Sequence, residues 1–244
     1  MNISCLEELQ MKLDLCLSCD EKLSILKDTG SKTGENNWFI VTDDGQCYLF
    51  DRYGNLDDIS KLTEIREHHI RQDIKRICIP DSVAHIRRYA FYGCHDLVYV
   101  VIPDSVKTID EWAFRSCISL ANVTISASTI SICNSVFSCC ISLANVTIPN
   151  GVKIIGDSVF SGCYSLTSVV MPNDVTRIGN DAFAYCSNLI SVTIPNSIMS
   201  IGESAFYYCT SLKSLVFKGK TLEQVKAMRY YPWGIKDEHL ICVE

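Results

Sequence analysis

The stretch IPDSVKTIDEWAFRSC, residues 102–117, returns in altered form as IPNGVKIIGDSVFSGC at 148–163 and as MPNDVTRIGNDAFAYC at 171–186. The starting positions of these copies differ by multiples of 23 residues. A fixed period of this length is typical of repeat proteins, in which each repeat forms one unit that stacks on the next. The sequence therefore predicts a solenoid.

Three apolar columns keep this period through six copies without an insertion. The aromatic column is Phe91, Phe114, Phe137, Phe160, Phe183 and Phe206. The thiol column is Cys94, Cys117, Cys140, Cys163, Cys186 and Cys209, and the leucine column is Leu97, Leu120, Leu143, Leu166, Leu189 and Leu212. Because one copy cannot bury its apolar side alone, we predict that copies stack and that these side chains form dry columns.

Each copy can be divided into local elements. In the copy that starts at Leu97, the side chains of Leu97, Val100 and Ile102 are expected to point inward from a short strand. The turn residues at 103–105 end this strand. Residues 110–114 are interpreted as a short helical turn. The predicted fold is a solenoid of short parallel β-strands and short helical turns, wound as a curved right-handed coil.

Residues 1–73 lie outside the period and are predicted to form a small α+β N-terminal cap. Helices are expected to begin at Ser4 and Asp20, and a third helical stretch is expected at 60–69. Between them, residues 38–41 and 47–50 flank a turn-forming segment and predict a β-hairpin.

The repeats are assigned to residues 74–217 and a C-terminal cap to residues 218–244. Thr221, with Gln224 three residues later, predicts a capped helix that covers the end of the stack. Tyr230, Tyr231 and Trp233 are expected to pack there.

The repeat unit I-P-[DN]-x-V-x-x-I-G-x-x-A-F-x-x-C-x-x-L-x-x-V, which covers about residues 74–217, resembles the BspA-like leucine-rich repeat proteins. The segment 217–243 is also similar to C-terminal caps of that family. The resemblance implies a curved parallel-sheet solenoid that binds proteins, often as a surface adhesin of bacteria or protists.

The composition of the chain argues against some classes of binding partner. The net charge of −6 and the pI near 5.4 argue against nucleic acid as the main partner. No apolar run approaches the roughly 18 residues that span a bilayer. The first residues do not form a signal peptide as written, because Glu7, Glu8 and Asp14 interrupt them. We therefore expect a cytoplasmic protein without membrane insertion, or a surface or secreted protein if a leader was removed.

Outward-facing residues of successive strands form the first candidate binding surface. Arg76, Tyr99, Asn122 and Asn145 are its candidate residues, with Arg76 and Tyr99 as anchors. The alternative is a ladder of Ser, Thr and β-branched residues that serves only sheet formation. Asn122 and Asn145 also begin N-V-T triplets, which are glycosylation sequons in a secreted protein.

A second candidate surface consists of aromatic residues that the repeat does not require to be buried. Trp112, Tyr207 and Tyr208 are its main candidates. Tyr92, Tyr164 and Tyr185 belong to the same group. Exposed aromatic side chains are enriched in protein interfaces.

Other reactive residue types are given structural interpretations. The thiol column could form a metal rack or a disulfide ladder, but small buried thiols pack as apolar groups. Cys16 and Cys19 form one C-x-x-C pair without a second pair for zinc. His68 and His69 are adjacent and cannot share a helix face as metal ligands do. We therefore expect no catalytic residues, no metal and no cofactor.

The sequence favours a non-enzymatic module that binds another protein through an extended solenoid surface. Two alternatives remain: a BspA-type surface adhesin that binds host proteins, and an intracellular inhibitor, related to phage or host defence, that blocks an enzyme. One copy departs from the others, because Ser126, Thr129 and Cys133 replace Pro, Val and Gly. We interpret this departure as drift. The sequence does not define the partner or the oligomeric state.

Overall fold

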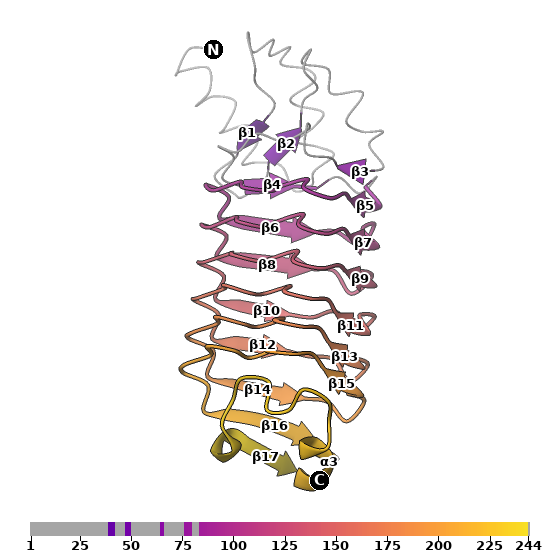
Figure 1. The fold of residues 1–244 in the computed structure, drawn as a ribbon. Helices are drawn as coiled ribbons and strands as arrows, with labels where there is room; N and C mark the ends of the chain where they lie inside the picture. Colours follow the sequence, from indigo (N-terminus) through magenta and orange to yellow (C-terminus); the bar gives the residue numbers. More distant parts are fainter. Residues whose placement is uncertain (1–38, 42–46, 50–63, 66–75, 80–82, 244) are drawn as a thin grey trace, which may run out of the picture.

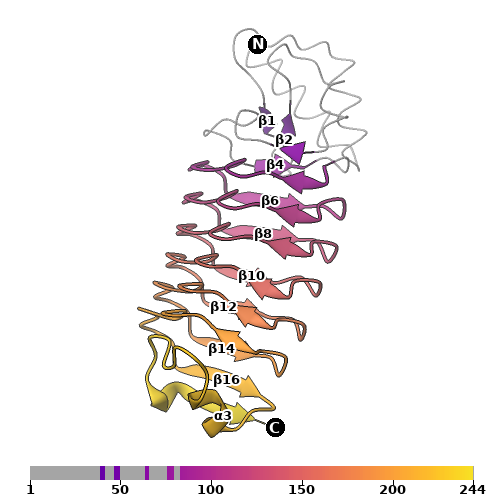
Figure 2. The same ribbon diagram turned by 45° about the vertical axis from the view of Figure 1, so that its right-hand side comes forward.

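The protein is a stack of coils in which the chain runs through two parallel sheets (Figures 1 and 2). The computed structural model describes residues 39–41, 47–49, 64–65, 76–79 and 83–243. Neighbouring strands in both sheets come from successive coils, and within residues 76–218 those that are 23 apart pair directly, as Tyr99 does with Asn122 and Ser168 with Ser191. The end pairs differ, since Glu64 pairs with His85 and Leu215 with Leu240. The predicted parallel solenoid is confirmed.

The first sheet has eight strands. In spatial order they are β4 (Arg76–Cys78), β6 (Tyr99–Ile102), β8 (Asn122–Ile125), β10 (Asn145–Thr147), β12 (Ser168–Val170), β14 (Ser191–Ile194), β16 (Ser214–Lys218) and β17 (Leu240–Val243). Leu97, Val100 and Ile102 are buried as predicted, while Val98 and Val101 are exposed. The alternation of inward and outward side chains therefore follows the period of a strand.

The second sheet has seven strands of two residues each. They are β3 (Glu64–Ile65), β5 (His85–Ile86), β7 (Thr108–Ile109), β9 (Ser131–Ile132), β11 (Ile154–Ile155), β13 (Arg177–Ile178) and β15 (Ser200–Ile201). Figure 2 shows these strands on the side of each coil opposite the first sheet. The second residue of β5, β7, β9, β11, β13 and β15 is a buried Ile.

The third side of each coil is a run of tight turns that also hydrogen-bonds to the next coil. In the first of these, the N–H groups of Phe91 and Gly93 donate to the carbonyls of Ala113 (2.7 Å) and Arg115 (2.9 Å). The intervening N–H of Tyr92 donates back to Tyr89 within its own coil (3.1 Å). The helical turn expected at 110–114 is therefore a non-helical turn, in which Trp112 has a φ of 60°.

The dry columns are present inside the stack. The phenylalanine rings from Phe91 to Phe206 stack with centroids 4.6–5.7 Å apart and with interplanar angles of 14° or less. Five thiols of the cysteine column are buried and Cys209 is half-buried. Each thiol from Cys117 to Cys209 also donates to a phenylalanine carbonyl, as Cys163 Sγ does to Phe137 at 3.2 Å.

A polar ladder runs beside the second sheet. The Asn134 side-chain carbonyl accepts a hydrogen bond from the backbone N–H of Asp157 (2.8 Å), and the Asp157 carboxylate accepts one from Asn180 (2.9 Å). Asn180 accepts in the same way from Glu203 (2.9 Å). Each side chain thus satisfies the backbone of the following coil, which fixes the coils in register.

The capped helix predicted near the C-terminal end is confirmed. Helix α3 (Leu222–Lys226) begins after Thr221, whose side chain forms the predicted capping box with Gln224. A 3₁₀ turn, η3 (Asp237–His239), leads into β17. Trp233 is buried and its carbonyl accepts from Phe206 (2.9 Å), so this segment closes the end of the stack.

One residue expected in that packing is instead exposed. Tyr231 is half-buried, but Tyr230 lies on the surface with the Arg229 guanidinium 4.5 Å from its ring centroid. Tyr230 can therefore contact Arg229 and solvent without entering the core.

At the N-terminal end, strands β1 (Phe39–Val41) and β2 (Cys47–Leu49) pair antiparallel and confirm the hairpin. The helical stretch predicted at 60–69 is wrong at Glu64–Ile65, because this segment is strand β3, which pairs with β5. Pairing with an existing strand edge outweighs a local helical preference of this kind. The helices predicted to begin at Ser4 and Asp20 lie outside the described residues.

Candidate protein-binding surface

The outward side of the first sheet, here called the strand face, holds the first group of candidate residues. Tyr99, Asn122 and Asn145 are adjacent in register on β6, β8 and β10. Arg76 pairs with Tyr99 through its backbone on β4. The two asparagines are exposed and Tyr99 is half-buried. The strands therefore bring these four positions into one row.

The polar side chains of the strand face largely bind one another. Asn145 Oδ1 accepts from Ser168 Oγ (2.7 Å) and from Thr167 Oγ1 (3.2 Å). Ser214 Oγ donates to Ser191 Oγ (2.8 Å). Side chains already paired along the ladder offer less to a partner, which favours the sheet-forming interpretation for this part of the row.

The turn side of the coils carries the second group. We call it the turn edge and define it by four positions per coil, which in the first coil are Arg88, Tyr89, Tyr92 and Gly93. The buried residues Ala90, Phe91 and Cys94 of the same turn point into the core. Trp112, Tyr207 and Tyr208, the other predicted aromatic candidates, occupy equivalent positions in later coils.

Two of these positions have a left-handed backbone in most coils. The second position has a φ between 51° and 60° at Tyr89, Trp112, Ser135, Ser158, Asp181 and Ser204. The fourth position has a φ between 57° and 75° at Gly93, Ser116, Cys139, Gly162, Tyr185 and Tyr208. A left-handed φ is uncommon for a bulky residue, so each large aromatic here is held against a local conformational preference.

The aromatic side chains of the turn edge form two clusters at opposite ends of the stack. In the first cluster, Tyr89 lies 4.9 Å from Trp112 and 5.6 Å from Tyr92, measured between ring centroids. The Arg88 guanidinium lies 4.1 Å from the Trp112 ring and forms an ion pair with Glu111 at 3.3 Å. Stacking and cation–π contacts hold these rings in place.

The second cluster consists of three tyrosines. Tyr185 stacks on Tyr208 at 5.4 Å, and Tyr207 meets both rings edge-on at 5.7 and 4.5 Å. Tyr207 and Tyr208 are 41% and 55% exposed, so the cluster faces solvent. The neighbouring Tyr208 raises the pKa of the Tyr207 hydroxyl, followed by burial and by Tyr185. The Tyr207 hydroxyl therefore stays protonated at neutral pH and can donate a hydrogen bond.

Two charged residues of the turn edge, Asp181 and Arg115, have unusual surroundings. Burial, together with Glu203 and Asp157, raises the pKa of the Asp181 carboxyl, and no cation contacts Asp181 among the described residues. Arg115, beside the first cluster, has a buried Nε without a hydrogen-bond partner in the described part of the chain. Arg115 therefore lies near one end of the edge and Asp181 near the other, each with an unsatisfied group among the described residues.

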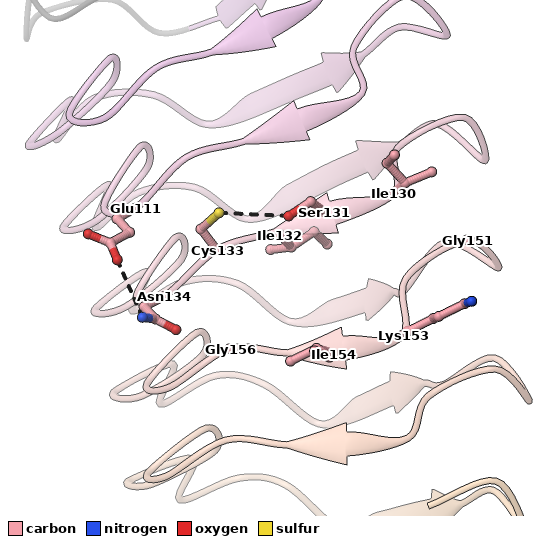
Figure 3. Close-up of a pocket in the computed structure, with 10 residues that line it drawn as sticks. All are labelled: Glu111, Ile130, Ser131, Ile132, Cys133, Asn134, Gly151, Lys153, Ile154 and Gly156. Atoms are coloured by element: carbon pink, nitrogen blue, oxygen red, sulfur yellow. Dashed lines mark hydrogen bonds between the residues drawn. The ribbon is translucent and has the colours of Figure 1, made fainter.

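An open depression of about 580 Å³ lies on the second sheet between β9 and β11 (Figure 3). Ile130 and Ile154 are exposed at its rim, and Glu111 accepts from Asn134 at the other side (3.4 Å). Ser131 contacts Cys133 within it at 3.7 Å. Its lining contains no set of groups that converges on one point, so it resembles a surface irregularity more than a ligand site.

The cysteines whose side chains the structure describes do not form a reactive centre. These nine cysteines form no disulfide with one another. Burial raises the pKa of Cys117, Cys140, Cys163 and Cys186, and raises that of Cys209 to about 12. A thiol needs a lowered pKa to act as a nucleophile at neutral pH, so these groups are poor nucleophiles. The pair Cys16 and Cys19 lies outside the described residues, as do His68 and His69.

Among the described residues, no cluster of three His, Cys, Asp or Glu side chains could hold a metal ion. Within the same segments, no helix is both long enough and apolar enough to cross a membrane.

The comparisons define the class of protein. The family model for the BspA-type leucine-rich repeat region matches residues 67–190 and 130–231 with six copies. The chain therefore belongs to the BspA-type leucine-rich repeat proteins. A search of curated proteins finds no matching relative.

Two solved bacterial structures share the fold. A leucine-rich cell surface protein of Faecalibacterium prausnitzii is 29% identical over 73% of this chain, with a TM-score of 0.52. The T. pallidum leucine-rich repeat protein TpLRR is 27% identical over 71% of this chain and 86% of its own, with a TM-score of 0.58. This chain spans 52% of the F. prausnitzii protein.

Some features of the turn edge were not anticipated from the sequence. Arg88, Tyr89 and Arg115 were not among the candidates, although they contact or flank Trp112. A signal for the left-handed positions was available, because Gly93 and Gly162 recur at the fourth position of the turn. A glycine at a fixed repeat position often marks a positive φ, and bulky residues at that same position are then unusual.

Proposed function

We propose that this protein is a non-enzymatic interaction module that binds another protein through the turn edge of its solenoid. The observation that carries the proposal is the placement of Tyr89, Trp112, Tyr185 and Tyr208 at left-handed backbone positions. Each such residue costs about 1–2 kcal/mol relative to an ordinary backbone conformation. Other coils use Ser or Gly at these positions, so the fold itself does not require the aromatic rings.

The physical mechanism is recognition by a rigid row of anchors. Ring stacking and the hydrogen bonds between coils fix the aromatic side chains before a partner arrives. A preorganised surface loses little conformational entropy on binding, which favours affinity. Tyr, Trp and Arg are also the residue types that carry most binding energy in protein interfaces. Trp112, Tyr207 and Tyr208 are the proposed anchors.

The strand face is a secondary proposed surface. Arg76, Tyr99, Asn122 and Asn145 would contact a partner that extends across the sheet. Its polar groups are partly paired with each other, so we expect it to add contact area more than binding energy.

The alternative of a surface adhesin has one observation in its favour. The similar F. prausnitzii protein is described as a cell surface protein. Protease treatment of intact cells that express the native gene tests this alternative, because an exposed adhesin is digested and an internal protein is protected. The other alternative, an inhibitor that blocks an enzyme, has no comparable support from the described residues.

A capture experiment tests the proposed function. The full chain is immobilised beside a variant with Trp112→Ser, Tyr185→Ser and Tyr208→Ser, since serine already occupies these turn positions at Ser135 and Ser116. A matched control carries three serine substitutions on the exposed strand-face residues Val101, Thr147 and Val170.

We expect the wild type and the strand-face variant to retain the same protein from a lysate of the source organism or its host. The turn-edge variant should lose it, with an unchanged melting temperature. Equal capture by all three proteins would show that the turn edge is not the binding surface.

A further inference from the structure

The outward residues of the turn edge are distributed almost symmetrically along the six coils. The first and last coils each carry two aromatic residues, Tyr89 with Tyr92 and Tyr207 with Tyr208. The second and fifth coils carry one each, Trp112 and Tyr185. The third and fourth carry only small or polar residues, which are Asn134, Ser135, Ser138, Cys139, Asp157, Ser158, Ser161 and Gly162.

The two aromatic clusters are offset across the edge. Tyr89 and Trp112 occupy the second position of the turn, whereas Tyr185 and Tyr208 occupy the fourth. A two-fold axis perpendicular to the edge, between the third and fourth coils, reverses both the order of coils and the order of positions. It therefore brings the first two coils of one molecule over the last two coils of another, with Tyr89 opposite Tyr207.

We propose that the turn edge binds a second copy of this chain, in an antiparallel arrangement around that two-fold axis. This inference rests on the proposed function, because it takes the turn edge as a protein-binding surface and names its partner. Isologous contacts of this kind need one self-complementary patch, and they are the commonest way in which soluble proteins form dimers.

Charge supports this partner. The two-fold operation places the third turn position of the second coil, Arg115, opposite the second position of the fifth coil, Asp181. Among the described residues, Arg115 Nε has no hydrogen-bond partner, and Asp181 lies near the like charges of Glu203 and Asp157. In the dimer, each of the two residues would face a residue of opposite charge.

Side-chain size is complementary in the same superposition. Trp112 lies opposite Ala184, which is buried and projects no side chain from the edge, and Tyr92 lies opposite Ser204. Arg88 lies opposite Tyr208, where a cation–π contact can form. The small residues of the two central coils let the two edges approach there. Large groups therefore meet small ones at several positions, and the ends are joined by aromatic contacts.

The size of the edge sets the expected strength. Six coils at roughly 4.8 Å spacing give an edge about 25–30 Å long and only four residue positions wide, so the contact area is expected to fall below the roughly 800 Å² per partner of a standard interface. We therefore expect a reversible dimer with a dissociation constant in the micromolar range, on the order of 10 μM.

Sedimentation of the full chain tests the proposal through a charge reversal. The variants are Arg115→Asp, Asp181→Arg and the double variant, measured from about 1 μM to about 1 mM. The control is Lys153→Asp, which changes an exposed charge at the residue before β11. An Arg at position 181 sits at the same turn position as Tyr89 and Trp112, so the backbone already accepts a large residue there. Melting temperatures report on folding.

We expect the wild type and the control to dimerise, each single variant to weaken dimerisation at least about 10-fold by placing like charges together, and the double variant to restore it. A wild type that stays monomeric, or a double variant no better than the single ones, overturns the proposal. Such a result leaves the capture experiment with Trp112, Tyr185 and Tyr208 free to support or reject the proposed function on its own.

Discussion

Gly179 shows how closely successive coils approach one another. A Cβ atom at this position would lie 2.4 Å from Asp157 Oδ1 and 2.6 Å from the backbone N of Asp157. Backbone cannot move aside as a flexible side chain can, so the coil would shift and strain the polar ladder. We expect Gly179→Ala to lower the free energy of unfolding by about 2–4 kcal/mol.

Urea unfolding measures this cost, and Gly151→Ala is the matched control. Its Cβ would meet the Ile130 methyl group at 3.1 Å, which can rotate away, so the cost there should be below about 1 kcal/mol. Equal losses for the two variants would argue against the close contact at Gly179.

The buried thiols predict a loss of stability at high pH. Burial raises the pKa of Cys209 from 9.0 to about 12, and it also raises those of Cys117, Cys140, Cys163 and Cys186. Above pH 9 the unfolded chain releases these protons while the folded chain keeps them, so alkaline pH favours unfolding. Each thiol should cost about 1.4 kcal/mol per pH unit between pH 9 and its folded pKa.

Denaturant unfolding between pH 8 and pH 11 gives this slope. Cys209→Ala removes one thiol and should make the slope shallower than in the wild type, whereas a slope unchanged by the substitution would contradict the role of burial. Tyrosine and lysine titrations are common to both proteins and cancel in the comparison.

The apolar columns could be predicted at the scale of residues because each repeats at every period. The hydrogen-bonding role of the thiols could not, since sequence spacing places a Cys beside the core without indicating the Phe carbonyl that it reaches. The left-handed turn positions were missed for a related reason. The positive φ of Trp112 is imposed by backbone hydrogen bonds to the following coil and not by the residues next to it in the chain.

The coil that lacks the usual Pro and Gly makes the weakest contact with the coil that follows it, and we call this contact the weak joint. β8 and β10 share one residue pair, whereas β6 and β8 share four. On the second sheet, the N–H groups of Cys133, Gly179 and Gly202 each donate to the preceding coil at 2.8–3.0 Å. Among these described positions, the equivalent N–H of Gly156 has no such bond. The departures at Ser126, Thr129 and Cys133 coincide with this joint.

Amide hydrogen exchange tests the joint directly. We expect the Gly156 N–H to exchange faster than those of Gly179 and Gly202, because exchange requires an amide that is free of its hydrogen bond. Two-dimensional NMR spectra recorded after transfer into D₂O resolve these glycine signals. Equal protection of the three amides would contradict a weak joint.

Some of the secondary-structure elements could be predicted from the sequence, and others could not. The long strands and the capped helix α3 follow from alternation and from the Thr221–Gln224 spacing. The second sheet was missed because strands of two residues, such as His85–Ile86, are too short to show any alternation. Strand β3 was mistaken for helix since its pairing with β5 depends on a partner about one coil away in the chain.

At the scale of the whole molecule, stacking decides where the candidate residues lie. Trp112 and Tyr208 are far apart in the chain, yet the shared register places them on one edge. Tyr185 lies between them along this edge, and Tyr89 lies in the coil before Trp112. The candidate surface could be predicted to this extent from the repeat alone. The burial of individual turn positions could not, because it depends on how the backbone of each turn is arranged.

Removal of one complete repeat tests the central claim, that residues 23 apart lie directly over one another. Deletion of residues 171–193 should leave a cooperatively folded protein with unchanged far-ultraviolet circular dichroism per residue and a lower urea midpoint, because repeat stability is a sum over coils and their interfaces. The shorter deletion of residues 171–181 should abolish cooperative unfolding, because it puts Phe206 and Leu212 out of register. If the shorter deletion is tolerated as well as the full repeat, the coils do not stack as described.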